Sequence, residues 1–128
     1  MNSYLATNVG SDHRGKISAE LSKLSPQWYF PSLYYTRVFS KGEISVLFVF
    51  IDTWELVGGE SWVHGAHQHV VDSQQLEWLK TVLNATEYTF KVVVGHYPIH
   101  SVREDTPGLV KDLLPILVSN QVDLYLHG

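Results

Sequence analysis

The sequence lacks cysteine altogether, so disulfide bonds, thiolate metal ligands and a cysteine nucleophile are excluded. It has little positive charge: nine Lys and Arg against thirteen Asp and Glu give a net charge of −4, with no basic stripe. Nucleic-acid binding and attraction to an anionic membrane need such a stripe, and we expect neither. The longest apolar run, from Val46 to Ile51, is far too short to cross a bilayer.

Apolar and aromatic residues are plentiful by contrast. The hydrophobic fraction is 45%, with four Trp, seven Tyr and five Phe among 128 residues, which predicts one compact domain or a piece of one. Residues 1–11 are small and polar, and they lack the basic and apolar stretches of an export signal. We interpret them as an irregular leader and expect the folded part to span residues 12–128.

The first half of the chain predicts one helix, two strands and a long loop. Ile17, Leu21 and Leu24 have the spacing of a short amphipathic helix that ends before Pro26. Strands are predicted over residues 33–39 and 44–51, with a turn at residues 41–42. Residues 55–71 are rich in Gly and His, which indicates a surface loop.

The second half predicts two helices that alternate with strands over residues 92–94 and 122–126. Asp72 is expected to cap the first helix, and Gln75 to complete a capping box. Thr106 and Pro107 are typical of a second helix start, and Pro115 predicts a kink within that helix. The buried residues expected on the two helices are Leu76, Leu79, Val82 and Leu83, and Leu109, Val110, Leu113, Leu114 and Leu117. This order predicts an α/β fold with a mixed, largely parallel sheet, whose functional residues follow the strand ends.

The segment from Val92 to Pro98 resembles the Gly-His-Tyr-Pro segment of the purple, or tartrate-resistant, acid phosphatases, within the calcineurin-like metallophosphoesterase superfamily. Further matching residues are Asp12, His13, Gly15, Trp28, Phe30 and Pro31 before it, and Leu109, Val110, Lys111, Tyr125 and Leu126 after it. The resemblance implies a partial αββα sandwich, mainly its C-terminal half. Residues 12–128 would then be a metallophosphoesterase domain truncated before the last metal-ligand motif.

The resemblance also implies hydrolysis of phosphomonoesters by a dinuclear centre that pairs iron with iron, zinc or manganese. Of the seven protein ligands expected in the family, only His96 has a counterpart here. Gly10 and Ser11 stand where the family has its Asn ligand and catalytic His, and His127 precedes the last motif rather than belonging to it. One imidazole cannot hold two metal ions, so we expect a chain that retains no metal and is inactive by itself.

Other polar residues have weaker assignments. Asp12 and His13 match family residues that orient metal ligands, and His100 could face a substrate or simply be an exposed loop residue. Asn84 begins an Asn-Ala-Thr glycosylation motif, which is usable only if the chain is exported. Three loop histidines, His64, His67 and His69, have a spacing that could bring two imidazoles onto one ion, although such residues are usually solvated.

Three functions stay open at this point. The chain is a fragment or truncated form of an acid phosphatase, or a non-catalytic metal- or protein-binding module that retains the half-fold, or a hydrolase completed by a second chain. The resemblance suggests a secreted or lysosomal protein, although the chain itself shows no export signal. In each case the missing layer would leave apolar surface bare, so we expect self-association.

Overall fold

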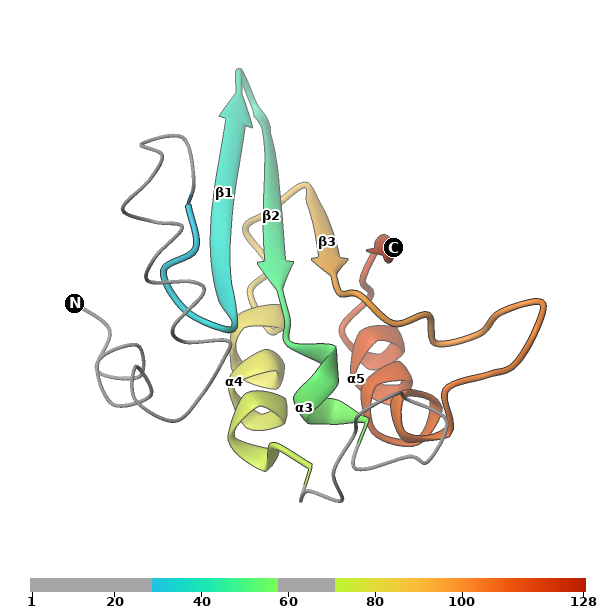
Figure 1. Cartoon of the computed structure of the whole chain (residues 1–128). Coiled ribbons are helices and arrows are strands. Elements are labelled where there is room, and N and C mark those ends of the chain that lie inside the picture. Colours follow the sequence, from blue (N-terminus) through green and yellow to red (C-terminus); the bar gives the residue numbers. More distant parts are fainter. Residues whose placement is uncertain (1–28, 58–70) are drawn as a thin grey trace. The chain divides into compact units, whose positions relative to one another are not determined.

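The computed structural model describes residues 29–57 and 71–128 (Figure 1). The chain forms two units, which divide between residues 35 and 36. The elements are β1 (Tyr35–Lys41), β2 (Ile44–Phe50), α3 (Thr53–Leu56), α4 (Ser73–Leu83), β3 (Phe90–Val94), the π-helical turn η1 (Leu109–Leu113), α5 (Leu114–Ser119) and β4 (Leu124–Leu126). None of the helices in the described ranges has the length and apolar character of a membrane span.

A four-stranded sheet in the order β1-β2-β3-β4 forms the framework. Strands β2, β3 and β4 are parallel, with Val49 opposite Val93 and Val93 opposite Tyr125. Strand β1 runs opposite to β2, to which it is joined by a tight turn (Figure 1). Gly42 has φ +60 in this turn, a conformation that glycine adopts without strain. The predicted α/β fold with a mixed, largely parallel sheet is therefore confirmed.

Several predicted boundaries need correction. Strand β1 lies two residues later than predicted, β3 begins earlier, at Phe90, and β4 is shortened to three residues. The predicted loop at residues 55–71 was wrong at its start, because residues 53–56 form α3. Asp52 caps this short helix, its Oδ1 accepting from the backbone N of Trp54 at 3.0 Å. The predicted helix at residues 17–24 and residues 58–70 of the loop lie outside the described residues.

Helix α4 confirms its predicted cap but not the capping box. Asp72 Oδ1 accepts from the backbone N of Gln75 at 3.0 Å. The side chain of Gln75 does not return to Asp72, because it is fully buried and bonds to the backbone of Asp52 instead. Leu79 and Leu83 are buried as predicted, whereas the predicted Leu76 and Val82 are only partly buried.

The last helix shows how the chain accommodates Pro115. Helical residues begin at Pro107, as predicted, although the hydroxyl of Thr106 donates to the carbonyl of Pro98 rather than capping the helix. Residues 109–113 form the π-helical turn, in which the backbone N of Leu114 donates to the carbonyl of Leu109. Proline cannot donate to the carbonyl four residues back and its ring crowds that carbonyl, so a wider turn before Pro115 relieves the conflict.

The hydrophobic core lies between one face of the sheet and the helices. Leu47, Val49 and Val93 point from this core face toward α4 and the η1–α5 helix, where Leu79, Leu83, Leu109 and Leu113 are buried. Burying each such side chain stabilises the fold by about 1.5–3 kcal/mol. The core therefore holds the strands in place through packing against the helices.

The opposite face of the sheet, the second face, is also apolar. The alternation of side chains along paired strands puts nine residues on it: Ile44, Val46, Phe48, Phe50, Phe90, Val92, Val94, Leu124 and Leu126. Four of the nine are exposed, with fractions of 54% for Ile44, 46% for Phe90, 49% for Leu124 and 42% for Leu126. Within β2, β3 and β4 no charged residue interrupts this face. Parallel sheets ordinarily have both faces covered.

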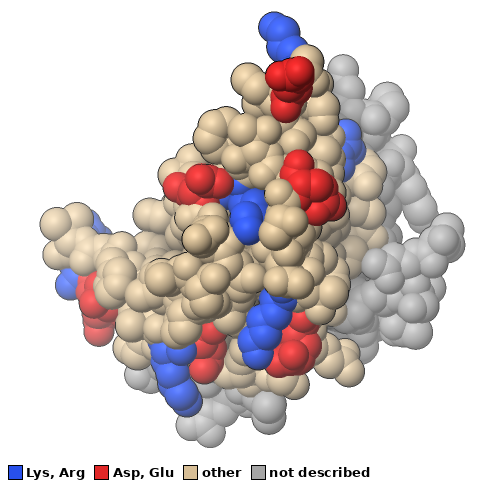
Figure 2. Space-filling model, turned by 180° about the vertical axis from the view of Figure 1, so that it is seen from behind, with Lys and Arg blue, Asp and Glu red and all other residues tan. Residues whose placement is uncertain are grey.

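Charged side chains are mixed in sign over the surface. Figure 2 shows Lys and Arg lying close to Asp and Glu on the face in view, separated by wide uncharged areas. No extended patch of one sign appears on this face.

Candidate functional site at the strand ends

The carboxyl ends of β2, β3 and β4 meet at one edge of the sheet. Asp52 and Thr53 follow β2, His96 and Tyr97 follow β3, and His127 follows β4. Hydrogen bonds continue beyond the strands, from Ile51 N to Val94 O at 2.9 Å and from Gly95 N to Leu126 O at 2.9 Å. Edges of this kind are where ligands bind in open parallel sheets.

Thr53 holds the loop that carries His96. Its Oγ1 accepts from the backbone N of His96 and from the backbone N of Tyr97, both at 3.2 Å. Thr53 is only 2% exposed, so these bonds are shielded from water. The first turn of α3 thereby positions the residues that follow β3.

Tyr125 holds the same loop from the side of β4. Its hydroxyl donates to the carbonyl oxygen of Tyr97 at 2.7 Å. Burial raises the pKa of Tyr125, so the hydroxyl stays protonated and remains a donor.

Gly95 makes this close packing possible. A Cβ atom at this position would lie 2.5 Å from the hydroxyl of Tyr125 and 2.6 Å from Cγ2 of Thr53. Real Cβ atoms do not approach other atoms so closely. The glycine before His96 is therefore required by the two side chains that hold the loop.

Asp52 is fixed through its backbone by Gln75. The amide of Gln75 accepts from Asp52 N at 2.8 Å and donates to Asp52 O at 3.1 Å. The carboxylate of Asp52 caps α3. Its negative charge also raises the pKa of Tyr97, although burial of Tyr97 is the larger cause of that rise. Asp52 thus joins β2, α3 and α4 at the edge of the site.

His96 is exposed, and its ring contacts that of Tyr97 at a centroid distance of 5.0 Å. The backbone N of Gly128 donates to the carbonyl of His96 at 3.2 Å. Continuing the β3–β4 register therefore places His127 beside Gly95 rather than beside His96. That His96 binds metal and His127 does not stays a prediction.

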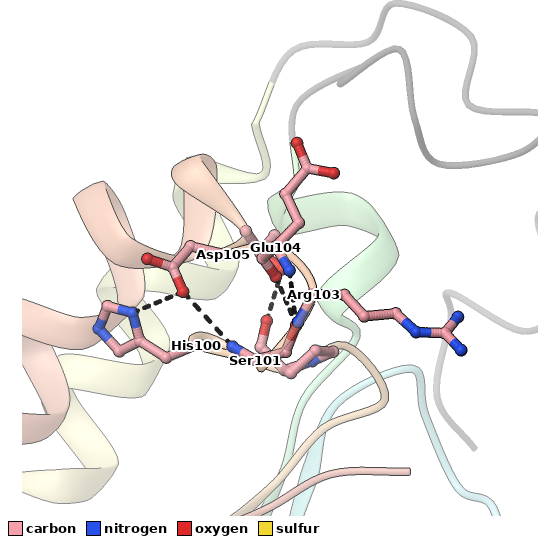
Figure 3. A network of polar contacts seen from close by, with 7 residues as sticks. His100, Ser101, Arg103, Glu104 and Asp105 are labelled. Atoms are coloured by element: carbon pink, nitrogen blue, oxygen red, sulfur yellow. Dashed lines mark hydrogen bonds and ion pairs between the residues drawn. The ribbon is translucent and has the colours of Figure 1, made fainter.

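His100 pairs with its own loop rather than with His96. Its Nδ1 lies 3.0 Å from Asp105 Oδ1, and both side chains are more than half exposed (Figure 3). Asp105 Oδ1 also accepts from the backbone N of Ser101, and the Ser101 hydroxyl donates to the carbonyl of Glu104 at 2.6 Å. A role of His100 toward substrate stays a prediction.

The remaining sequence-predicted residues lie either outside the described ranges or elsewhere in the fold. Asp12, His13 and the three loop histidines lie outside the described residues. Asn84 follows α4 and precedes β3, away from the strand ends. Within residues 29–57 and 71–128, no group of three or more His, Cys, Asp or Glu is arranged to hold a metal ion.

No role in the site was predicted from the sequence for four residues that shape it: Thr53, Gln75, Gly95 and Tyr125. Their contacts join residues that lie 23 to 44 positions apart. Asp52 and Glu55 have the spacing of a helix N-terminus, which could have indicated α3 and with it a role for Thr53.

Comparison with known structures defines the fold class. GAP50, described as the anchor in the inner membrane complex of Plasmodium, has a TM-score of 0.62 and 27% sequence identity. The alignment covers 91% of this chain and 39% of GAP50. The chain therefore has a metallophosphoesterase-like α/β fold.

Sequence comparison defines the relationship more narrowly. Tartrate-resistant acid phosphatase type 5 of Sus scrofa is 37% identical and that of Homo sapiens 36%, while purple acid phosphatase 7 of Arabidopsis thaliana is 33% identical. Each match covers 91% of this chain. The chain is a homologue of the tartrate-resistant and purple acid phosphatases. It spans only 38–39% of the length of these relatives, and no family model matches it.

Proposed function

We propose that this chain is part of an acid phosphatase that hydrolyses phosphomonoesters, in which His96 supplies one ligand of a dinuclear metal centre. The observation that carries the proposal is the position of His96, held by Thr53 and Tyr125 where three parallel strands end. The proposed activity is taken from the names of the homologues, which are acid phosphatases. The proposed metals, iron with iron, zinc or manganese, are those that the family resemblance implies.

The donors that the structure describes do not fit two metal ions. His96 has no second and third protein ligand arranged around it in the described ranges. Asp52 lies at the same edge, but one of its carboxylate oxygens caps α3. We therefore assign no reaction step to this chain by itself and propose that it is inactive without further donors.

The second face of the sheet supports a partial fold. Four of its nine apolar residues, Ile44, Phe90, Leu124 and Leu126, are exposed, whereas parallel sheets ordinarily have both faces covered. The homologues are long enough to provide a further layer, since this chain spans only 38–39% of their length.

A chimaera tests the proposed role of His96. The segment of the Sus scrofa phosphatase that matches residues 29–128 is replaced by those residues, so that the relative supplies the other ligands. We expect the chimaera to hydrolyse p-nitrophenyl phosphate and His96→Ala to abolish this activity. The matched control is His127→Ala, which should remain active. Full activity of the His96→Ala chimaera would overturn the assignment.

The isolated chain tests the proposed inactivity. With added ferric, ferrous, zinc or manganese ions it should hydrolyse no p-nitrophenyl phosphate above the blank. Turnover that disappears on chelation would show that donors from elsewhere, including a second chain, complete the centre.

A second candidate function is favoured by the second face. A non-catalytic chain would use this surface to bind protein. Within β2, β3 and β4 the second face carries no charged residue, which makes it complementary to a second copy of itself. Sedimentation should then show self-association that Leu124→Lys abolishes. Val118→Lys is the control, because Val118 is 69% exposed on α5 and not on this face. A chain that is monomeric at all concentrations would exclude this function.

A further inference from the structure

The turn after α4 carries an unused modification motif. Asn84, Ala85 and Thr86 match Asn-X-Thr, the acceptor sequence of N-glycosylation. Asn84 ends α4 with φ −69 and ψ −9, and its backbone N donates to the carbonyl of Lys80 at 3.2 Å. Asn84 and Thr86 are both exposed, and neither side chain makes a hydrogen bond or ion pair within the described ranges. The amide and the hydroxyl that a transferase must reach are both accessible.

The position of Asn84 is compatible with the other surfaces of the fold. Asn84 precedes β3, which begins at Phe90, whereas His96 follows the end of β3. A glycan on Asn84 therefore starts at the opposite end of the sheet from the candidate site. Because it starts from the helix layer, it also leaves the second face free.

A groove beside Asn84 offers a surface for the first sugar. It has a volume of about 720 Å³ and lies between the C-terminal end of α4 and the length of α5. The groove is shallow and open, so a sugar would lie over it rather than enter an enclosed pocket. Pro115 and Ile116 give the groove an apolar part, against which a sugar ring can pack.

Polar groups frame the apolar part of the groove. Asn120 donates through Nδ2 to the carbonyl of Ile116 at 2.9 Å, which leaves its amide oxygen as an acceptor for a sugar hydroxyl. At the rim, Lys80 has N–H groups beyond the one that it donates to Glu77, and the Ser119 hydroxyl, which donates to the carbonyl of Ile116, can accept. An apolar surface with a few polar groups beside it is the usual chemistry of a carbohydrate contact.

We propose that Asn84 carries an N-linked oligosaccharide whose first N-acetylglucosamine lies over this groove. The donor is a lipid diphosphate-linked oligosaccharide. The Nδ2 atom of Asn84 forms a bond to the anomeric carbon, the bond from that carbon to the diphosphate oxygen breaks, and the amide loses one proton to the transferase. The reaction belongs to the secretory pathway, so the proposal concerns the exported form of the protein.

Expression of the full chain behind a cleavable export leader in eukaryotic cells tests the attachment. The wild type and Thr86→Ser should each carry one glycan, which peptide N-glycosidase removes to leave aspartate at position 84 in the mass spectrum. Asn84→Gln and Thr86→Ala should lose the glycan completely. Glycan occupancy is measured on total cell protein as well as on secreted protein. Chains that misfold and stay in the cell are then also counted. A translocated wild-type chain without the glycan would overturn the proposal.

Hydrogen exchange tests the groove separately. Trimming the glycan with an endoglycosidase leaves a single N-acetylglucosamine, and this form is compared with the unmodified chain produced in bacteria. We expect slower amide exchange in residues 115–120 and unchanged exchange in residues 90–94. Identical exchange in residues 115–120 would refute the sugar–groove contact.

Discussion

Gly95→Ala is the substitution that probes the candidate site most directly. The new methyl group would meet the hydroxyl of Tyr125 at 2.5 Å and Cγ2 of Thr53 at 2.6 Å. Both side chains also hold the backbone around His96, through bonds of 2.7 and 3.2 Å. The substitution therefore acts on the packing of the loop and on its hydrogen bonds together.

The expected loss of stability is a balance of three effects. Overpacking costs about 1–3 kcal/mol, and a displaced hydrogen bond from Tyr125 adds about 1 kcal/mol. Alanine has less conformational freedom than glycine in the unfolded chain, which offsets the loss by about 0.4–1 kcal/mol. This gain applies because the backbone at Gly95 does not have the positive φ that alanine avoids. We expect the free energy of unfolding to fall by about 2 kcal/mol.

Thr53→Ser provides a matched rescue. Serine keeps the Oγ acceptor for His96 and Tyr97 but lacks the methyl group that collides with a side chain at position 95. In urea unfolding followed by tryptophan fluorescence, Gly95→Ala should cost about 1 kcal/mol less in the Thr53→Ser background. Thr81→Ser, an exposed threonine on α4, is the control and should give no rescue.

Two results would refute this reasoning. Additivity of Gly95→Ala and Thr53→Ser within about 0.5 kcal/mol would show that the two positions do not interact. A Gly95→Ala chain as stable as the wild type would show that the backbone shifts freely at this point, so that Tyr125 and Thr53 do not hold the His96 loop.

Three further predictions concern residues that join elements of the fold. Gln75→Leu should lower the free energy of unfolding by about 2–3 kcal/mol, because it strands the buried N–H and C=O of Asp52. Asp72→Ala should cost only about 1 kcal/mol for the lost α4 cap, and the reverse ranking in urea unfolding would contradict the assignment. Lys91→Met should cost about 2 kcal/mol, measured in the same way, since its Nζ bonds the last carbonyls of α4 and α5 at 3.1 and 2.6 Å. Because burial raises the pKa of Tyr125 above its ordinary value of 10.0, the folded state keeps a proton that the unfolded state loses. Its stabilising effect is complete below pH 10 and declines as the pH rises further, so stability should fall above pH 10, and Tyr125→Phe should flatten that fall.

The sequence allowed the alternation of strands and helices to be predicted, because each element has its own local apolar pattern. The run from Ile44 to Ile51 predicted a strand, and β2 has apolar residues on both faces. The run could not show that the helices cover only one face of the sheet and leave residues of the second face exposed. Helix α3 was missed because four residues are too few to show helical periodicity, although Asp52 gave the capping signal.

The candidate site was less predictable for a physical reason. His96 could be proposed from the short segment around it, since a family motif is local. Gln75 has the sequence of a capping-box residue, but its side chain gains more by bonding a buried backbone across the fold than by closing its own helix. The contacts of Thr53 and Tyr125 likewise depend on strand pairing, which local patterns do not specify.

The structure holds His96 in position independently of whether His96 binds a metal ion. The loop carrying His96 is held by Thr53, Tyr125 and the neighbouring strand through bonds that need no metal ion. A dinuclear centre needs several donors converging on the same point, and the described residues contain no group of three or more His, Cys, Asp or Glu arranged to hold a metal ion. The described residues can therefore keep His96 in place whether or not a metal centre forms. The second face, with Ile44, Phe90, Leu124 and Leu126 exposed, gives the same fold an apolar surface for association with another layer.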